Sequence, residues 1–350
     1  MADVPVVASR HGGDFERTEL DALVTQRRDG YFGRAAPIDS NATGEPRIVL
    51  NECYGAVPAQ QEKRQRLQER TVEEVAEAEQ LRGCAGRYED KVVIVTGGAR
   101  GIGEGCVRVF FEAGSNVVIC DRDEEGGRGM AEQLNQKSKI MTTSGKKNQA
   151  FFIRADVSIS KDLQEVIDAT ISCFGKIDCL VNNAGWHPPP KSIDEFTVDQ
   201  MQDLMQLNFM SVFALCKFVL PHLRKVKGNI INISSLVGAF GQANATTYAA
   251  TKGAVTAFTK ALAIDEAKHG VRINTVSPGN IWTPLWKAGA DSEEDPTAAR
   301  EAGDRVQVLG RKGTILETGR LCLCIAADMT FTTGFDHIQS GGAEIGYGIK

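Results

Sequence analysis

The pattern of hydrophobic and polar positions changes near residue 91. From there on, short apolar runs alternate with longer stretches of helical character. The run at residues 92–95 is continuously apolar, as expected for a parallel strand covered on both faces. Further strands are predicted at residues 116–120, 151–153, 177–181, 229–233, 271–276 and 336–339, and helices at 101–113, 123–134 and 198–224. Such serial β–α units predict an α/β fold, a doubly wound parallel sheet of about seven strands with helices on both faces.

Residues 1–86 do not share this alternation and are expected to form an N-terminal extension to a domain at 87–350. Charged residues and glutamine dominate residues 59–82, where a helix with a thin apolar stripe is predicted. One interpretation is a flexible arm of mixed charge. The other is a docking helix for a partner or a second subunit, and the sequence leaves both open.

Composition narrows the class of protein. The chain has 350 residues, of which 42% are hydrophobic, enough for one large α/β domain. The formal net charge of -5 argues against a nucleic-acid-binding surface. The longest apolar candidate for a membrane span, residues 210–223, is interrupted by Lys217 and Pro221, so no span is expected. The N-terminus also lacks the basic-then-apolar layout of a secretory signal.

Nine cysteines are scattered along the chain, and most fall inside predicted strands or helices. This is typical of small buried residues in a reducing compartment, so a cytoplasmic location is expected. Cys322 and Cys324 form a Cys-x-Cys pair without a second cysteine or histidine cluster nearby. No metal site is therefore predicted.

A glycine-rich loop, Thr96-Gly97-Gly98-Ala99-Arg100-Gly101-Ile102-Gly103, lies where the first predicted strand ends and a helix begins. Glycine lets the chain turn sharply and lets its backbone approach a pyrophosphate closely. The helix N-terminus adds N–H donors and the positive end of the helix dipole. The loop therefore predicts a bound dinucleotide, held by Gly97, Arg100, Gly101, Ile102 and Gly103.

Asp121 ends the second predicted strand, 18 residues beyond Gly103. An acidic residue at this place hydrogen-bonds the adenosine ribose and repels a 2′-phosphate, which favours NAD over NADP. Arg100 and Arg122 argue for NADP because each can pair with a phosphate. We give Asp121 the greater weight and expect NAD.

Other strand ends supply further cofactor candidates at the carboxyl edge of the sheet, where such folds bind ligands. Each of these positions, taken singly, could belong to an ordinary turn, but together they indicate a cofactor-binding site along this edge of the sheet. They are Asp156, Val157, Asn183, Ala184, Gly185, Pro278, Gly279, Ile281 and Thr283.

Tyr248 and Lys252 are four residues apart in a helical stretch, so they face the same side. Oxidation of a secondary alcohol sends a hydride to a nicotinamide while a base removes the hydroxyl proton. A phenol has a pKa near 10, and a nearby ammonium lowers it. We therefore expect Tyr248 to be the acid/base, and Lys252 to lower the pKa of Tyr248 and to bind the cofactor ribose.

Two more residues complete this catalytic set. Ser235 ends the fifth predicted strand and is expected to hold the substrate oxygen by a hydrogen bond. Asn208, in the long helix, is expected to fix a water that links Lys252 to solvent. General acid/base assistance of this kind accelerates a reaction by about 10²- to 10⁴-fold.

These motifs, in this order, resemble the classical short-chain dehydrogenase/reductase family over residues 87–350. The resemblance implies a Rossmann-like fold and NAD-dependent oxidation of an alcohol. The segments NNAGWHPPP, NISSLVG, SPGNIWTPLW and GGAEIGYG further resemble the type 14 branch of the 17β-hydroxysteroid dehydrogenases. That branch implies a homotetramer and a 17β-hydroxysteroid such as estradiol as substrate.

The same resemblance implies an apolar substrate pocket near His187, Gln242, Trp282 and Trp286, with Tyr347 from a neighbouring subunit. Two alternatives stay open. The branch is also associated with oxidation of a free sugar, L-fucose in particular. A catalytically silent NAD-binding scaffold belongs to another class, and the presence of the serine, tyrosine and lysine argues against it.

The chain also departs from the family pattern. Residues 1–86 have no counterpart, and Trp186-His187 stands where the resembled branch has two histidines. The helix expected within residues 314–330 lacks the usual Pro-Glu opening and carries Arg320 among small apolar residues. This last departure concerns the packing of that helix and, through it, one subunit interface.

Overall fold

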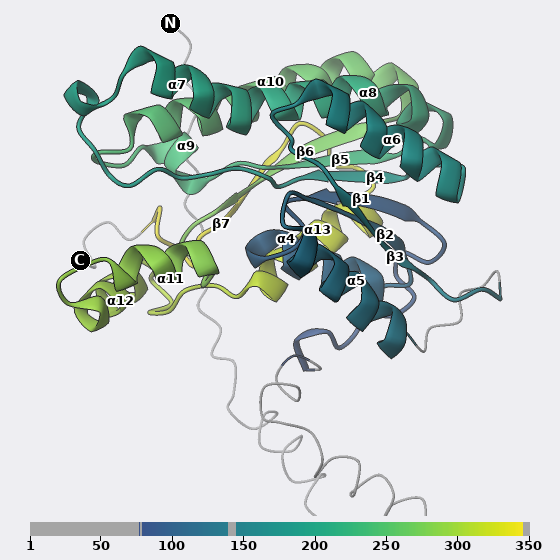
Figure 1. The fold of residues 1–350 in the computed structure, drawn as a ribbon, viewed down its shortest axis with the longest axis horizontal. Coiled ribbons are helices and arrows are strands. Elements are labelled where there is room, and N and C mark those ends of the chain that lie inside the picture. The colour runs from purple at the N-terminus through teal and green to yellow at the C-terminus, as the bar shows by residue number, and fades with distance from the viewer. Residues whose placement is uncertain (1–76, 78, 139–144, 346–350) are drawn as a thin grey trace, which may run out of the picture. The chain divides into compact units, whose positions relative to one another are not determined.

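The computed structural model describes residues 77, 79–138 and 145–345 (Figure 1). Seven parallel strands form one sheet in the order β3-β2-β1-β4-β5-β6-β7. The predicted doubly wound sheet is confirmed, and each predicted strand overlaps an observed one. The strands are β1 (Val92–Thr96), β2 (Asn116–Asp121), β3 (Ala150–Arg154), β4 (Cys179–Asn182), β5 (Asn229–Ile233), β6 (Arg272–Pro278) and β7 (Asp336–Gln339).

Helices cover both faces of the sheet (Figure 1). Helices α4 (Gly101–Glu112), α5 (Glu124–Lys137) and α13 (Ile315–Ala327) pack on one face. Helices α6 (Ser160–Phe174), α8 (Ser211–Val226) and α10 (Thr246–Glu266) pack on the other. The shorter elements are η1 (Ile193–Glu195), α7 (Val198–Met205), α9 (Leu236–Phe240), η3 (Ala267–His269), α11 (Pro284–Asp291) and α12 (Pro296–Arg305).

The long helix predicted at 198–224 is observed as α7 and α8 joined by a π-helical turn, η2 (Gln206–Met210). Among the described residues this stretch, Val198–Val226, is the one helix long and apolar enough to cross a membrane by length and composition alone. However, 44% of its most apolar window is buried in the protein, because α8 packs on α6 and β4. A core helix meets the same criterion, so the stretch is weak evidence for a span.

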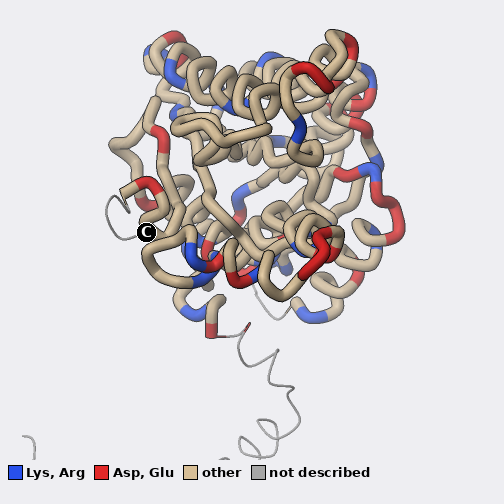
Figure 2. Tube along the Cα trace, turned by 90° about the vertical axis from the view of Figure 1, so that its left-hand side faces the viewer, with Lys and Arg blue, Asp and Glu red and all other residues tan. Residues whose placement is uncertain are grey.

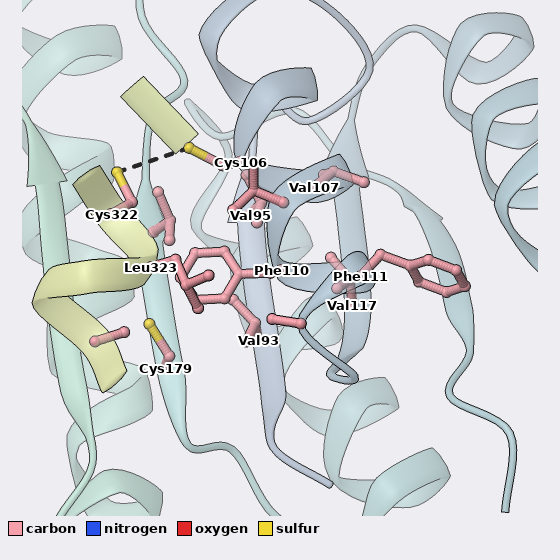
Figure 3. Close-up of a cluster of buried hydrophobic side chains, with 14 of the residues drawn as sticks. Val93, Val95, Cys106, Val107, Phe110, Phe111, Val117, Cys179, Cys322 and Leu323 are labelled. Atoms are coloured by element: carbon pink, nitrogen blue, oxygen red, sulfur yellow. Dashed lines mark hydrogen bonds between the residues drawn. The ribbon is translucent and has the colours of Figure 1, made fainter. Parts of the chain in front are cut away.

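The core on the α4 side joins that helix to α13 (Figure 3). The two helices approach closely at Gly105, which has no side chain. A Cβ at this position would lie 2.1 Å from the Ile315 carbonyl oxygen. Phe110 and Leu323 pack beneath this crossing, and Cys106 Sγ lies 3.8 Å from Cys322 Sγ. All eight cysteines in the described part of the chain are free thiols, and six of them are buried.

Helix α13 begins without the Pro-Glu opening of the family. Thr314 and Glu317 form a capping box instead, in which each side chain bonds the other residue's backbone N–H. Arg320 points outward and donates to the Gln80 carbonyl over 2.9 Å. The two sequence departures therefore leave α13 packed on α4.

The segment before β1 also belongs to the packed core. Cys84 is fully buried, Tyr88 is buried, and Leu81 packs against the same cluster. Within the helix predicted at 59–82, positions 77, 79 and 80 are helical, whereas residues 59–76 lie outside the described residues. The boundary drawn at residues 86 and 87 remains a prediction.

Basic and acidic positions are mixed along the chain. In the trace of Figure 2, Lys and Arg positions are interspersed with Asp and Glu positions. Several of these charges pair along a helix, as between Arg128 and Glu124 or Lys287 and Asp291. Exposed pairs of this kind contribute about 0–1 kcal/mol each.

Candidate active site

A cavity of about 560 Å³ opens at the carboxyl ends of the strands, next to the point where strand order reverses between β1 and β4. Its wall brings together segments that are far apart in the sequence. All predicted cofactor residues except Gly103 and Ile281 line it: Gly97, Arg100, Gly101, Ile102, Asp121, Asp156, Val157, Asn183, Ala184, Gly185, Tyr248, Lys252, Pro278, Gly279 and Thr283.

The glycine loop requires its glycines for steric reasons. Gly97 and Gly101 have φ values of +61° and +60°, which favour glycine. A Cβ on Gly103 would lie 2.0 Å from the Gly97 carbonyl oxygen. Asn183 ties the loop to β4, because its Nδ2 donates to the carbonyls of Thr96 (2.9 Å) and Gly97 (3.1 Å).

The first turn of α4 faces this cavity, since Gly101 and Ile102 line the wall. Arg100 is the N-cap residue and makes no side-chain capping hydrogen bond. The first backbone N–H groups of α4 are thus available to an anion, together with the positive end of the helix dipole. These residues fit the pyrophosphate of a dinucleotide.

Asp121 is held in a fixed position at the cavity wall. Its Oδ2 accepts from the Ala99 N–H and its Oδ1 from the Asp123 N–H, each over 3.0 Å. Arg122 lines the same wall, so a carboxylate and a guanidinium both reach the adenosine end. Asp156 accepts from the Ser158 N–H (2.9 Å) and hydroxyl (2.7 Å), and these hydrogen bonds lower the pKa of its carboxyl.

Tyr248 and Lys252 lie one turn apart on α10 and face the cavity together, as predicted. Lys252 Nζ donates to the Ile233 carbonyl over 2.8 Å and lies 5.9 Å from the centre of the Tyr248 ring. Burial lowers the pKa of Lys252 to about 8. Burial also raises the pKa of Tyr248 to about 12, while the hydrogen bond with Ser235 acts in the opposite direction. Desolvation therefore outweighs the hydrogen bond with Ser235, and a lowering of the Tyr248 pKa by Lys252 stays a prediction.

Ser235 is buried and lies two residues after the end of β5. Its Oγ accepts from the Val237 N–H over 3.2 Å, which caps the short helix α9. The neighbouring Ser234 donates to the Lys252 carbonyl over 2.9 Å and fixes β5 against α10. Ser235 and Tyr248 consequently share one end of the cavity.

Asn208 is fully buried in the π-helical turn and is fully engaged. Its Oδ1 accepts from the Trp186 N–H, and its Nδ2 donates to the Trp186 carbonyl, both over 2.9 Å. Nδ2 also donates to Thr251 Oγ1 over 3.1 Å. In the part of the chain that the structure describes, Asn208 thus holds the loop after β4 and makes no direct hydrogen bond to Lys252. The predicted water link between them remains a prediction.

His187 lies against the phenol of Tyr248, with ring centres 4.1 Å apart. Its Nδ1 is 2.6 Å from the Pro188 carbonyl oxygen. A carbonyl only accepts, so Nδ1 carries the proton and Nε2 is left as an acceptor in the neutral ring. Burial lowers the pKa of His187, which favours this neutral form.

Six predicted site residues do not line the cavity: Gly103, Asn208, Gln242, Ile281, Trp282 and Trp286. Gln242 is exposed, and Ile281 is buried against Gly313. Trp282 and Trp286 pack on each other with ring centres 5.7 Å apart, next to Lys312. Trp286 is partly buried and Trp282 is 42% exposed outside the cavity wall, and Tyr347 lies outside the described residues.

Sequence reasoning missed several residues that do line the cavity, among them Trp186, Leu285 and Ala288. Trp186 directly precedes the predicted His187, and this position in the sequence could have indicated that it lies near the site. Leu285 and Ala288 belong to α11, whose sequence carries no pattern that points to a binding wall. Among the described residues, no group of three or more His, Cys, Asp or Glu side chains is arranged to hold a metal.

A family model described as short chain dehydrogenase matches residues 91–294. The chain belongs to the short-chain dehydrogenase family. It is accordingly an oxidoreductase that binds a nicotinamide cofactor, in agreement with the glycine loop and the Tyr248–Lys252 pair.

Curated relatives of this short-chain dehydrogenase include sugar-oxidising enzymes. L-fucose dehydrogenase of Mus musculus is 50% identical over 264 residues, which cover 75% of this chain and 92% of the mouse protein. L-fucose dehydrogenase of Rattus norvegicus is 50% identical over 267 residues, which cover 76% of this chain and 94% of the rat protein. These names favour the sugar alternative, and the expected 17β-hydroxysteroid specificity receives no support from them.

The fold of this short-chain dehydrogenase is similar to that of a solved sugar reductase. L-sorbose reductase from Gluconobacter frateurii, complexed with NADPH and L-sorbose, matches with a TM-score of 0.67 and 25% identity. The match covers 73% of this chain and 97% of the reductase. The cofactor in that structure is NADPH, so fold similarity does not decide between NAD and NADP here.

Proposed function

We propose that this protein is an NAD-dependent dehydrogenase that oxidises a secondary hydroxyl of a free sugar such as L-fucose. The proposal rests on the surroundings of the Tyr248 phenol. Ser235, His187 and Lys252 lie next to it, in the same cavity that the glycine loop lines. The sugar is supported by the 50% identity to the rodent L-fucose dehydrogenases over most of their length. Trp282 and Trp286, which were expected to form an apolar steroid pocket, do not line the cavity.

The chemistry follows from the side chains at this end of the cavity. Bound NAD supplies the hydride acceptor and a positively charged ring. The Ser235 hydroxyl donates a hydrogen bond to the substrate oxygen, and Tyr248 accepts the hydroxyl proton as the C–H hydride departs. The ammonium of Lys252, 5.9 Å from the Tyr248 ring, favours the phenolate. His187 Nε2 is free to accept a hydrogen bond from a second substrate hydroxyl, which a sugar offers.

NAD is proposed over NADP because the Asp121 carboxylate is fixed by two backbone N–H groups at the cavity wall. A fixed carboxylate repels a 2′-phosphate and accepts hydrogen bonds from the unmodified ribose. Arg100 and Arg122 act in the opposite direction, as each lines the cavity. The ratio of kcat/KM for the two cofactors measures which effect prevails.

The deciding experiment is NADH formation by the purified protein with L-fucose and estradiol offered in parallel. Efficient turnover of L-fucose with slow turnover of estradiol supports the proposal. The reverse result restores the steroid. Tyr248→Phe is the matched control, because it keeps the ring against His187 but removes the proton acceptor. We expect this variant to lose about 10²- to 10⁴-fold in kcat while it retains its affinity for NAD. A near-normal rate would exclude Tyr248 as the acid/base. If the wild type oxidises neither substrate, the result would favour a silent scaffold.

We also propose a homotetramer in the cytoplasm, as the resemblance and the cysteine pattern predict. Light scattering coupled to size exclusion measures the mass of the assembly. Fractionation of the source cells tests the location. A monomer, or a protein that sediments with membranes, would contradict the respective proposal.

A further inference from the structure

Trp186 is an exposed aromatic residue at the functional cavity. Trp186 lines the cavity, and 47% of the residue is accessible to solvent. The other two tryptophans, Trp282 and Trp286, pack on each other and on Lys312. Among the described residues, no aromatic pair includes Trp186. An exposed tryptophan at the cavity, without an aromatic partner among the described residues, is available for contact with a ligand.

Both backbone polar groups of Trp186 form hydrogen bonds with one buried side chain. The buried Asn208 side chain accepts from its N–H and donates to its carbonyl, each over 2.9 Å. The next residue, His187, lies 4.1 Å from the Tyr248 ring centre. The backbone of Trp186 is thus fixed close to Tyr248, so this segment of the loop needs little ordering when a ligand binds.

We propose that Trp186 determines substrate specificity by stacking on the apolar C–H face of a pyranose ring. This inference rests on the proposed function. A pyranose carries hydroxyls around its rim and C–H groups on its faces, and an indole face is electron-rich and flat. Trp186 then contacts a ring face while Tyr248 and His187 contact hydroxyls. Leu285 and Ala288 of α11 add apolar surface to the same cavity.

The test compares two variants at position 186 in the full-length protein. Trp186→Ala removes the indole, and Trp186→Phe keeps an aromatic face. We expect KM for L-fucose to rise about 10-fold in Trp186→Ala, to rise less than 3-fold in Trp186→Phe, and kcat to change little in either. Phe331→Ala, which removes a fully exposed aromatic residue outside the cavity wall, is the matched control and leaves both constants unchanged.

A second substrate separates stacking from general damage. A small open-chain secondary alcohol such as 2-butanol has a reacting hydroxyl and no ring face. Its kcat/KM should be the same in Trp186→Ala and in the wild type. A parallel loss with both substrates would mean that Trp186 supports the fold of the site and would overturn the stacking role.

Binding without turnover gives an independent readout. In a Tyr248→Phe background with NAD present, L-fucose should quench part of the tryptophan fluorescence, and Trp186→Phe should abolish that change. If the wild type oxidises L-fucose and Trp186→Ala has an unchanged KM, the inference is wrong while the proposed function stands. If the wild type does not oxidise L-fucose, both fall. A changed oligomer mass with an unchanged KM would make Trp186 an interface residue, which also overturns the inference.

Discussion

The ammonium of Lys312 lies 3.9 Å from the centre of the Trp286 ring. Lys312 is buried, and its Nζ also donates to the Arg300 carbonyl (2.6 Å) and to Asp304 Oδ1 (2.8 Å). Trp286 belongs to α11, whereas Arg300 and Asp304 belong to α12. One cation therefore joins two helices to the segment that precedes α13.

This contact is expected to position the cavity wall, because α11 carries Thr283, its N-cap, together with Leu285 and Ala288. A desolvated cation over an indole contributes about 2 kcal/mol. Lys312→Met should raise KM for NAD and for the sugar several-fold, with a smaller change in kcat. Steady-state kinetics measures this. Lys287→Met, which removes an exposed lysine of α11 paired with Asp291, is the control and should leave both KM values unchanged.

Lys252 is expected to reduce stability while serving catalysis. Its pKa of about 8 in the folded protein lies below the value near 10.4 of an unfolded chain. The unfolded state therefore binds more protons between pH 8 and about 10.4, and stability rises with pH across that window. Below pH 8 the buried ammonium is a net cost.

Lys252→Met should therefore raise the free energy of unfolding at pH 7 by roughly 1–3 kcal/mol while abolishing turnover. Denaturant unfolding at pH 7 and pH 10 measures the difference, which should shrink at the higher pH. Lys260→Met, at an exposed position on the same helix, is the control and should show little change at either pH. A destabilised Lys252→Met variant at pH 7 would contradict the argument.

Asp121→Ala should narrow the preference for NAD over NADP by about 10-fold or more, because it removes the fixed carboxylate and leaves Arg122 at the wall. The ratio of kcat/KM values for the two cofactors is the measurement. Glu125→Gln removes an exposed acidic charge from the start of α5 and controls for net charge. An unchanged ratio in Asp121→Ala would show that another residue discriminates.

Two truncations test where the packed domain begins. Cys84 is fully buried and Leu81 packs on the α4 core, while Gln80 accepts from Thr314 and Arg320. A chain lacking residues 1–86 should melt several degrees below a chain lacking residues 1–76. Calorimetry of both variants measures this. Equal melting temperatures would place the boundary at residue 87, as the sequence predicted.

The strands and the cofactor loop could be predicted because their signals are local. A parallel strand covered on both faces needs a continuous apolar run, and β1 is buried at every position. The turn at Gly97 and the close approach at Gly103 admit only glycine. Tyr248 and Lys252 share a helix face by their spacing alone. These features depend on residues within a few positions of each other.

Only the tertiary structure decided which aromatic residues face the cavity and which way the pKa of Tyr248 moves. The sequence predicted Trp282 and Trp286 as pocket residues. In the structure both contact Lys312, which also bonds Asp304 of α12. Trp186 reaches the wall because Asn208, 22 residues away, holds its backbone. Burial by many segments raises the pKa of Tyr248 above that of a free phenol. Such outcomes depend on packing between distant segments, which spacing along the chain does not encode.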